Sequence, residues 1–137
     1  MERLKSLSCF FPAYNEEANL PRRLDEVVAT IPRFAEQWEA VIVDDGSTDR
    51  TAEIVSEFSE RHPEVRLVRH AENRGYGEAL RTGFGACTGE AVFFTDADLQ
   101  FRLDDLERVV PAFADARSEE HTSELQALAY LVCRLLL

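Results

Sequence analysis

The sequence is poor in positive charge and contains no long apolar run. Its 137 residues include 15 lysine and arginine residues against 26 aspartate and glutamate residues, which gives a net charge of -11, and Lys5 is the only lysine. This acidic balance argues against nucleic acid as a partner and against electrostatic attraction to an anionic membrane. No stretch has the length of a signal peptide's apolar segment or of a membrane-spanning helix.

Cysteine is also scarce, which limits the cross-links and metal sites that the chain can form. Cys9, Cys87 and Cys133 are odd in number and far apart in the sequence. This pattern favours free thiols in apolar surroundings over a disulfide or a zinc site. We therefore expect a reducing, cytoplasmic setting.

Several catalytic signatures are missing. His62, His70 and His121 have no metal-ligand spacing, so we expect exposed histidines. The chain has neither a Gly-X-Ser-X-Gly motif nor a lysine-bearing phosphate loop. These absences remove support for acyl transfer and for phosphoryl transfer of the P-loop type.

Short apolar runs alternate with helical patterns along a chain of one-domain length. Strands are predicted at 7–11, 40–43, 65–69 and 91–94, and helices at 19–32, from 51 to about 62, between the turn 73–77 and 89, and at 103–113. Pro12 should close the first strand because proline cannot donate to a ladder. The clean alternation in 65–69 predicts an edge strand. The fold class is therefore α/β, a parallel sheet of order 3-2-1-4 with helices on both faces.

Two carboxylates follow the last apolar run. Asp96 and Asp98 come directly after 91–94, and the period of two in extended backbone places both on one side. Two hard anionic oxygens that face one way suit Mg²⁺ or Mn²⁺, and such an ion leaves coordination positions for phosphates. A simple turn is the alternative, because short acidic patterns are common by chance.

Polar clusters at 12–17, 44–49 and 96–100 should meet at the carboxyl edge of this sheet, where ligands of open α/β sheets bind. The 44–49 segment has two readings, a helix-capping turn or carboxylates that accept from a base N–H or a ribose hydroxyl. In the turn 73–77, a close contact between helix and sheet is favoured over a phosphate loop.

Four segments together resemble the family 2 glycosyltransferases of GT-A fold, within the branch similar to dolichol-phosphate mannose synthase. They are Pro12-Ala13-Tyr14-Asn15-Glu16-Glu17, Val43-Asp44-Asp45-Gly46-Ser47-Thr48-Asp49, Asn73-Arg74-Gly75-Tyr76-Gly77-Glu78-Ala79 and Thr95-Asp96-Ala97-Asp98-Leu99-Gln100. The resemblance covers about residues 7–116. It implies a Rossmann-like GT-A sheet and the transfer of a sugar from a nucleotide diphosphate sugar to a polyprenyl phosphate, with inversion.

The resemblance also implies the site residues. Asp96 and Asp98 are similar to the family's metal-binding and catalytic pair for Mg²⁺ or Mn²⁺, with Gln100 as a further ligand. Asp44, with Asp45 beside it, would contact the base and ribose. The nucleotide pocket would be formed by Pro12, Ala13, Tyr14, Glu16, Asp44, Asp45, Ser47, Asp96 and Ala97.

The resemblance divides the chain in two. Residues 1–116 would be the nucleotide-sugar-binding half of a GT-A domain whose acceptor-binding arginines lie further along in the family, with the full-length protein at the cytoplasmic face of the membrane. Residues 117–126 resemble a translated sequencing-library adapter, and residues 131–137 resemble a segment that recurs with it, so we expect 117–137 to be a non-native tail. The alternative is an amphipathic helix, because Leu125, Leu128, Val132 and Leu135 keep helical spacing.

Two other functions fit parts of the pattern. A nucleotidyltransferase would need a basic phosphate loop after the first strand, but segment 13–16 has no lysine or arginine. A non-enzymatic receiver-like module around Asp44 and Asp45 would need a lysine near a late strand, and Lys5 is far from one. The sequence does not reveal the sugar, the acceptor or the oligomeric state.

Overall fold

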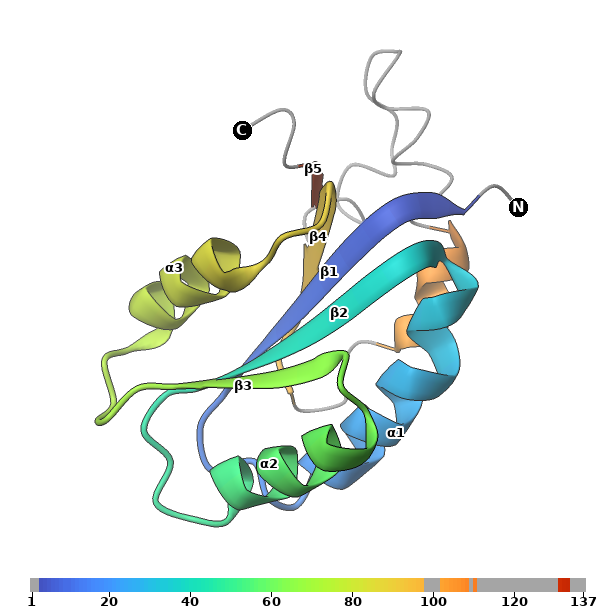
Figure 1. Cartoon of the computed structure of the whole chain (residues 1–137). Helices are drawn as coiled ribbons and strands as arrows, with labels where there is room; N and C mark the ends of the chain where they lie inside the picture. Colours follow the sequence, from blue (N-terminus) through green and yellow to red (C-terminus); the bar gives the residue numbers. More distant parts are fainter. Residues whose placement is uncertain (1–2, 98–101, 109, 111–130, 134–137) are drawn as a thin grey trace.

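The protein is organised around one central sheet. The computed structural model describes residues 3–97, 102–108, 110 and 131–133. The strands lie in the order β3-β2-β1-β4-β5 (Figure 1). They are β1 (Leu4–Ala13), β2 (Ala35–Asp44), β3 (Val65–Arg69), β4 (Ala91–Phe94) and β5 (Leu131–Cys133). The first four pair in parallel, which confirms the predicted order 3-2-1-4.

Helices cover both faces of the sheet, as predicted. Figure 1 shows α1 (Leu20–Thr30) and α2 (Thr51–Arg61) on one face and α3 (Tyr76–Ala86) on the other. Alternating strand residues feed two apolar cores, with Phe11 and Ile42 in the larger core under α1 and α2 and Phe10 and Val41 in the smaller core under α3. A short 3-10 turn, η1 (Ile31–Arg33), leads from α1 into β2.

The prediction that Pro12 closes the first strand is wrong, because β1 continues to Ala13 with Pro12 opposite Val43. The carbonyl of Phe10 accepts from Thr95 on the β4 side, and the carbonyl of Ala13 accepts from Asp45 on the β2 side. Backbone groups alternate between neighbours along a strand, so Pro12 turns its nitrogen toward the β4 side. The β1–β4 ladder ends at Phe10, so no ladder bond is lost there.

Both central strands begin earlier than the apolar runs predict. The ladder between β1 and β2 already starts where Leu4 pairs with Ala35. The first half of β2 carries the exposed residues Glu36 and Gln37, so its sequence lacks the apolar signal. Backbone pairing rather than burial extends these strands.

The end of the chain contributes a fifth strand to the sheet. Leu131–Cys133 form β5, which pairs antiparallel with the outer edge of β4 and adds to the four predicted parallel strands. The alternative helix over 125–135 is wrong at these three residues. The predicted helix 103–113 begins with a 3-10 turn, η2 (Leu103–Asp105), and Leu106 and Val110 are buried as expected. Its last residues, and most of the tail 117–137, lie outside the described residues.

The two cysteines whose side chains are described are buried and free, as predicted. Burial raises the pKa of the Cys9 thiol well above its usual value, and the nearby Cys87 and Glu39 act in the same direction. Such a thiol stays protonated and unreactive at neutral pH. Within the described ranges, no helix combines the length and the apolarity required to cross a bilayer.

Candidate functional site

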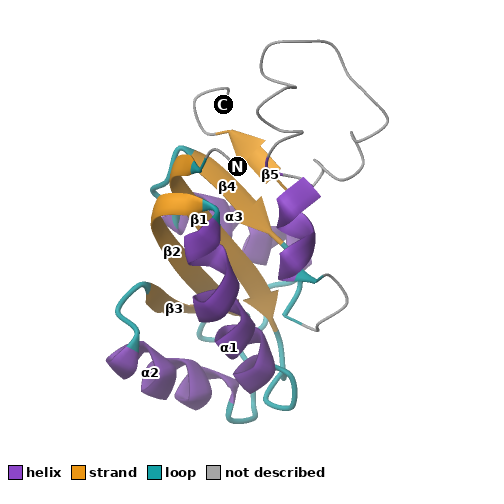
Figure 2. Ribbon diagram, turned by 90° about the vertical axis from the view of Figure 1, so that its right-hand side faces the viewer, coloured by secondary structure: helices purple, strands orange, loops and turns teal. Residues whose placement is uncertain are grey.

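A cavity of about 350 Å³ opens at the carboxyl edge of the parallel strands. Figure 2 shows the loops that follow these strands, in teal, together at this end of the sheet. The cavity receives residues from the ends of β1, β2 and β4 and from the start of α3. Its lining consists of Pro12, Ala13, Tyr14, Glu16, Asp45, Asn73, Gly75, Tyr76, Ala79 and Asp96.

The predicted nucleotide and metal residues divide into three groups. Six of them line the cavity, namely Pro12, Ala13, Tyr14, Glu16, Asp45 and Asp96. Three described residues, Asp44, Ser47 and Ala97, are buried beside it and do not line it. Asp98 and Gln100 lie outside the described residues, so their predicted metal-binding roles stay predictions.

The loops after β1 and β2 are joined by reciprocal hydrogen bonds. Asn15 adopts a left-handed backbone (φ 53°), donates its N–H to Ser47 Oγ at 2.8 Å and accepts from the N–H of Thr48 at 2.8 Å. The N–H of Glu16 donates to Thr51 Oγ1 at 2.9 Å. Ser47 therefore supports the site by holding the neighbouring loop, and the interlock positions the end of β1 at the cavity.

Asp44 is the last residue of β2 and is fully buried. Its Oδ1 accepts from the N–H of Ser47 at 3.0 Å. This bond closes a turn within the loop and does not cap α2, which begins at Thr51 without a side-chain cap bond at Arg50. Its Oδ2 makes no hydrogen bond within the described part of the chain, but Arg69 Nε lies 3.4 Å away as an ionic partner. Of the two aspartates, Asp45 is the one that lines the cavity.

Asp45 is held by three donors that come from later in the chain. Its Oδ1 accepts from the N–H of Arg74 at 2.9 Å and its Oδ2 from the N–H of Gly75 at 3.0 Å. His70 Nδ1 lies 2.7 Å from Oδ1. Burial acts to raise the pKa of Asp45, but these hydrogen bonds outweigh it and hold the pKa below its usual value. An ionised acceptor therefore faces the cavity at neutral pH.

The expectation of exposed histidines is wrong for His70, whose side chain is only 6% exposed. Its Nε2 lies 2.8 Å from Thr82 Oγ1 on α3, and its backbone N–H donates to the carbonyl of Asp44 at 2.9 Å. A buried histidine needs partners for both ring nitrogens, and both of its partners here lie on other elements. A single sequence does not show such partners.

The turn 73–77 contributes more to the site than the sequence predicts. Asn73, Gly75 and Tyr76 line the cavity, and Gly75 has a positive φ of 98° while it donates to Asp45. The close contact between helix and sheet that the sequence favours for this turn is not found at its glycines, because an added Cβ on Gly75 or Gly77 would have nothing within 4 Å among the described residues; the close contact lies further along α3, at Gly83. The turn lies between a parallel strand and the helix that follows it. This position in the sequence was a signal that could have predicted its place at the carboxyl edge of the sheet.

Asp96 is exposed at the cavity and its backbone is tied to α1. Its carbonyl accepts from Arg23 Nη2 at 3.3 Å, and the Arg23 side chain is fully buried. Glu26 Oε1 pairs with Arg23 Nη1 at 2.6 Å, and Glu26 Oε2 accepts from the N–H of Leu103 at 3.2 Å. The Arg23–Glu26 pair therefore holds the backbone on both sides of the segment that contains the Asp-X-Asp motif.

The oxygen donors of the cavity suit a hard divalent cation. Asp96, Glu16 and Asp45 all bring carboxylates to its lining, and Mg²⁺ and Mn²⁺ prefer such ligands. Among the described residues, no group of three histidine, cysteine, aspartate or glutamate side chains is close enough to hold a metal ion. Of the three predicted metal ligands, Asp98 and Gln100 lie outside the described residues, and Asp96 lines the cavity.

A parallel sheet of order 3-2-1-4 with this edge cavity defines an α/β ligand-binding domain. The glycosyl transferase family 2 profile matches residues 8–119, and the chain belongs to that family of glycosyltransferases. This match confirms the family predicted from the four segments.

Curated relatives support this membership. The chain is 39% identical over 103 residues to a dolichyl-phosphate beta-glucosyltransferase of Trichomonas vaginalis, covering 72% of this chain and 31% of that protein. It is 36% identical over 111 residues to an undecaprenyl-phosphate 4-deoxy-4-formamido-L-arabinose transferase of Photorhabdus laumondii, covering 80% of this chain and 34% of that protein. The chain thus spans about a third of the length of these relatives.

Solved structures agree on the GT-A fold. The mannosyltransferase PcManGT of Pyrobaculum calidifontis, solved with GDP-Man and Mn²⁺, superposes with a TM-score of 0.66 at 34% identity, covering 82% of this chain and 32% of that chain. TarS of S. aureus, solved with UDP-GlcNAc, superposes with a TM-score of 0.66 at 27% identity, covering 81% of this chain and 31% of that chain.

Proposed function

We propose that this chain is the nucleotide-sugar-binding part of a glycosyltransferase that moves a sugar from a nucleotide diphosphate sugar to a polyprenyl phosphate. The observation that carries the proposal is the edge cavity, in which ends of three parallel strands bring Tyr14, Asp45 and Asp96 together. The names of the relatives, which contain dolichyl phosphate and undecaprenyl phosphate, support the lipid phosphate as acceptor. A lipid acceptor in turn supports action at the membrane surface.

Each wall of the cavity suits one part of such a donor. Asp45 offers a fixed, ionised acceptor for a base N–H or a ribose hydroxyl. Tyr14 and Tyr76 are 46% and 55% exposed, and both line the cavity, where a flat base can pack against an aromatic ring. Asp96 lies at the end of β4, where the diphosphate would bind together with its cation.

The reaction would be a displacement at the anomeric carbon with inversion. A divalent cation, Mg²⁺ or Mn²⁺, held by Asp96 with Asp98 and Gln100, would supply positive charge that stabilises the leaving nucleoside diphosphate. A phosphate acceptor is already anionic at neutral pH and needs no general base, so this chain's residues bind and orient the donor. The Mn²⁺ in the structure of PcManGT supports the choice of ion.

Calorimetric titration of the chain with UDP and GDP, with and without Mn²⁺, tests this proposal. Asp98→Ala should abolish the metal-dependent binding, because one of two carboxylate ligands is lost. Asp105→Ala is the control, since Asp105 pairs only with the exposed Arg108 at 3.5 Å among the described contacts. Equal binding by the two variants would refute the site assignment.

A further inference from the structure

His70 connects the helix on one face of the sheet to the carboxylate in the cavity. It follows β3, with Nε2 2.8 Å from Thr82 Oγ1 on α3 and Nδ1 2.7 Å from Asp45 Oδ1. The imidazole is 6% exposed and does not belong to the cavity lining. A largely buried line of hydrogen bonds thus runs from Thr82 through His70 to Asp45.

The direction of these hydrogen bonds follows from the charge on Asp45. The pKa of Asp45 lies below its usual value, so the carboxylate is ionised and can only accept. Nδ1 of His70 therefore carries a proton and donates it to Asp45 Oδ1. In the neutral imidazole, Nε2 accepts from the Thr82 hydroxyl, which fixes the tautomer that points its N–H at the carboxylate.

Three donors determine how Asp45 is oriented. Oδ1 accepts from His70 and from the N–H of Arg74, and Oδ2 accepts from the N–H of Gly75. A carboxylate has about four lone-pair positions, so these bonds leave about one, on Oδ2, for a ligand. His70 is the only side chain among the three donors, and the other two are backbone groups of one turn.

We propose that His70 is a positioning residue of the nucleotide pocket, which with Thr82 orients the Asp45 carboxylate for the nucleoside without touching it. This inference rests on the proposed function, because it takes the ligand of Asp45 to be the base or ribose. It concerns the described part of the site alone and does not depend on Asp98 or Gln100.

The test compares a nucleotide with its inorganic part. Affinities for UDP and for inorganic pyrophosphate, each with Mn²⁺, are measured by calorimetry for the chain and its variants. His70→Leu removes the donor to Asp45 and should weaken UDP binding about tenfold, the effect of about one lost hydrogen bond. Pyrophosphate binding should stay unchanged, because that ligand has no base or ribose. A purely structural loss would weaken both ligands.

Conservative variants distinguish the loss of the hydrogen bonds from the loss of side-chain packing. His70→Asn keeps an N–H near the position of Nδ1 and should recover most of the UDP affinity. Thr82→Ser keeps the hydroxyl and should bind as the original chain does, whereas Thr82→Val should weaken UDP binding several-fold. His62→Leu is the matched histidine control, since His62 stacks on Phe58 at 4.6 Å at the opposite end of the sheet.

A double substitution tests whether His70 acts through Asp45. Asp45→Asn should weaken UDP binding by itself, and adding His70→Leu should then cause little further loss. Additive losses would overturn the proposal, as would unchanged UDP affinity in His70→Leu or equal losses for UDP and pyrophosphate. If His70→Leu does not fold, the comparison of Thr82→Ser with Thr82→Val, together with His70→Asn, decides between the same outcomes.

Absence of UDP and GDP binding by the folded, unsubstituted chain would instead refute the proposed function itself, and this inference with it.

Discussion

Asn15 shows how one residue supports the site through both its backbone and its side chain. It is the only described residue other than glycine with a positive φ, and its Oδ1 accepts from the N–H groups of Thr48 and Asp49 at 2.8 and 3.3 Å. Asparagine tolerates the left-handed region better than alanine does, and its short amide can bond locally.

Substitutions at Asn15 should separate these two contributions. Asn15→Ala loses the hydrogen bonds and strains the backbone, so we expect the free energy of unfolding to fall by about 2 kcal/mol. Asn15→Gly loses only the hydrogen bonds and should cost about 1 kcal/mol. Urea denaturation of both variants checks the order. A glycine variant less stable than the alanine variant would contradict the strain argument.

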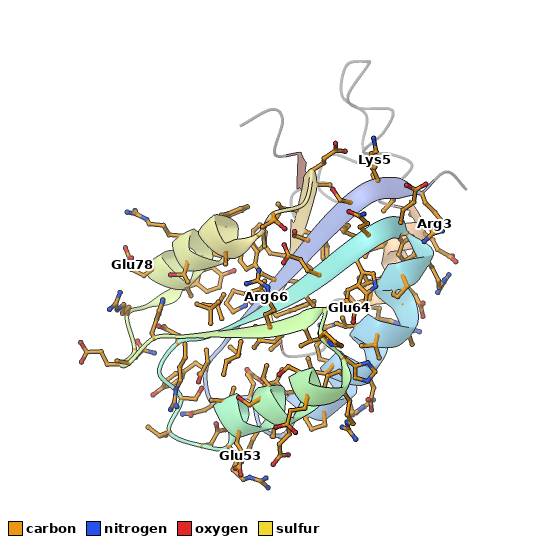
Figure 3. All side chains as sticks on the ribbon, in the orientation of Figure 1. Arg3, Lys5, Glu53, Glu64, Arg66 and Glu78 are labelled. Atoms are coloured by element: carbon orange, nitrogen blue, oxygen red, sulfur yellow. The ribbon has the colours of Figure 1, made fainter. Side chains whose placement is uncertain are left out.

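Glu39 is the residue at which pH should act on stability. Burial acts to raise its pKa, but hydrogen bonds from Ser8, the Thr88 backbone, Arg66 and the Thr88 hydroxyl outweigh burial and lower the pKa to about 2. Arg66 is labelled in Figure 3, and its Nη2 lies 2.7 Å from Glu39 Oε1. The same Nη2 also donates to the carbonyl of Ala86, at the C-terminal end of α3, at 2.8 Å.

A lowered folded-state pKa stabilises the protein at pH values above the unfolded-state pKa of about 4.3. The stabilisation then declines as the pH falls and is lost once the pH passes below the folded-state pKa of about 2. At neutral pH it amounts to about 3 kcal/mol at most. We expect Glu39→Gln to lower the free energy of unfolding at pH 7, with a smaller difference at pH 3.

Urea denaturation of the original chain and of Glu39→Gln at pH 7, 4 and 3 measures this dependence. Glu36→Gln is the matched control, because Glu36 is exposed on the same strand. A destabilisation by Glu39→Gln that does not change with pH would show that lost packing, rather than the lowered pKa, is responsible.

At the scale of elements, the position of α3 depends on a missing side chain. A Cβ on Gly83 would lie 2.2 Å from Cδ2 of Phe10. The Phe10 ring is fully buried, stacks on Phe94 at 5.1 Å and meets Phe84 edge-on at 5.0 Å, so it has no room to move. Glycine therefore lets α3 approach the sheet closely enough for Thr82 to reach His70.

Gly83→Ala should destabilise the protein by about 2 kcal/mol, because the added methyl group overpacks the core. Gly85→Ala is the matched control, since Gly85 lies in the same helix with nothing within 4 Å of an added Cβ. There, alanine should be neutral or stabilise by up to about 1 kcal/mol. Thermal unfolding of both variants measures the contrast, and equal effects would mean that the helix can shift away from the sheet.

At the scale of the whole molecule, we expect donor binding and acceptor binding to be separable. The chain spans about a third of the length of its curated relatives. Arg102 and Arg108 are the only cations in the sequence between 99 and 116, and the Arg108 side chain is 82% exposed. A phosphate acceptor needs positive groups that hold it in line with the sugar carbon.

We therefore predict that the 137-residue chain binds nucleotide but does not transfer sugar. The measurement is transfer of radiolabelled sugar from UDP-glucose or GDP-mannose to polyprenyl phosphate in detergent. A version of the chain extended with the acceptor part of a family member is the comparison. Turnover by the short chain that matches the extended one would show that the acceptor site lies within these residues.

The sequence by itself determined the order of the elements and the family. Apolar runs and helical spacing predicted four strands in the order 3-2-1-4, and polar clusters after three of them predicted one edge. These features are local or follow from the rules for parallel crossovers, so a single chain contains them. The bounds of β3 and the burial of Leu103 and Leu106 followed from periodicity in the same way.

Only the tertiary structure decided which side chains face the cavity. Asp44 and Asp45 look alike in sequence, but the N–H groups of Arg74 and Gly75, about thirty residues later, hold Asp45 at the cavity, while Asp44 accepts from the N–H of Ser47. His70 is buried because partners from two other elements satisfy its ring, and β1 passes through Pro12 because the β4 ladder has already ended. Each of these outcomes depends on hydrogen-bond partners that are distant in sequence, and folding alone brings them together.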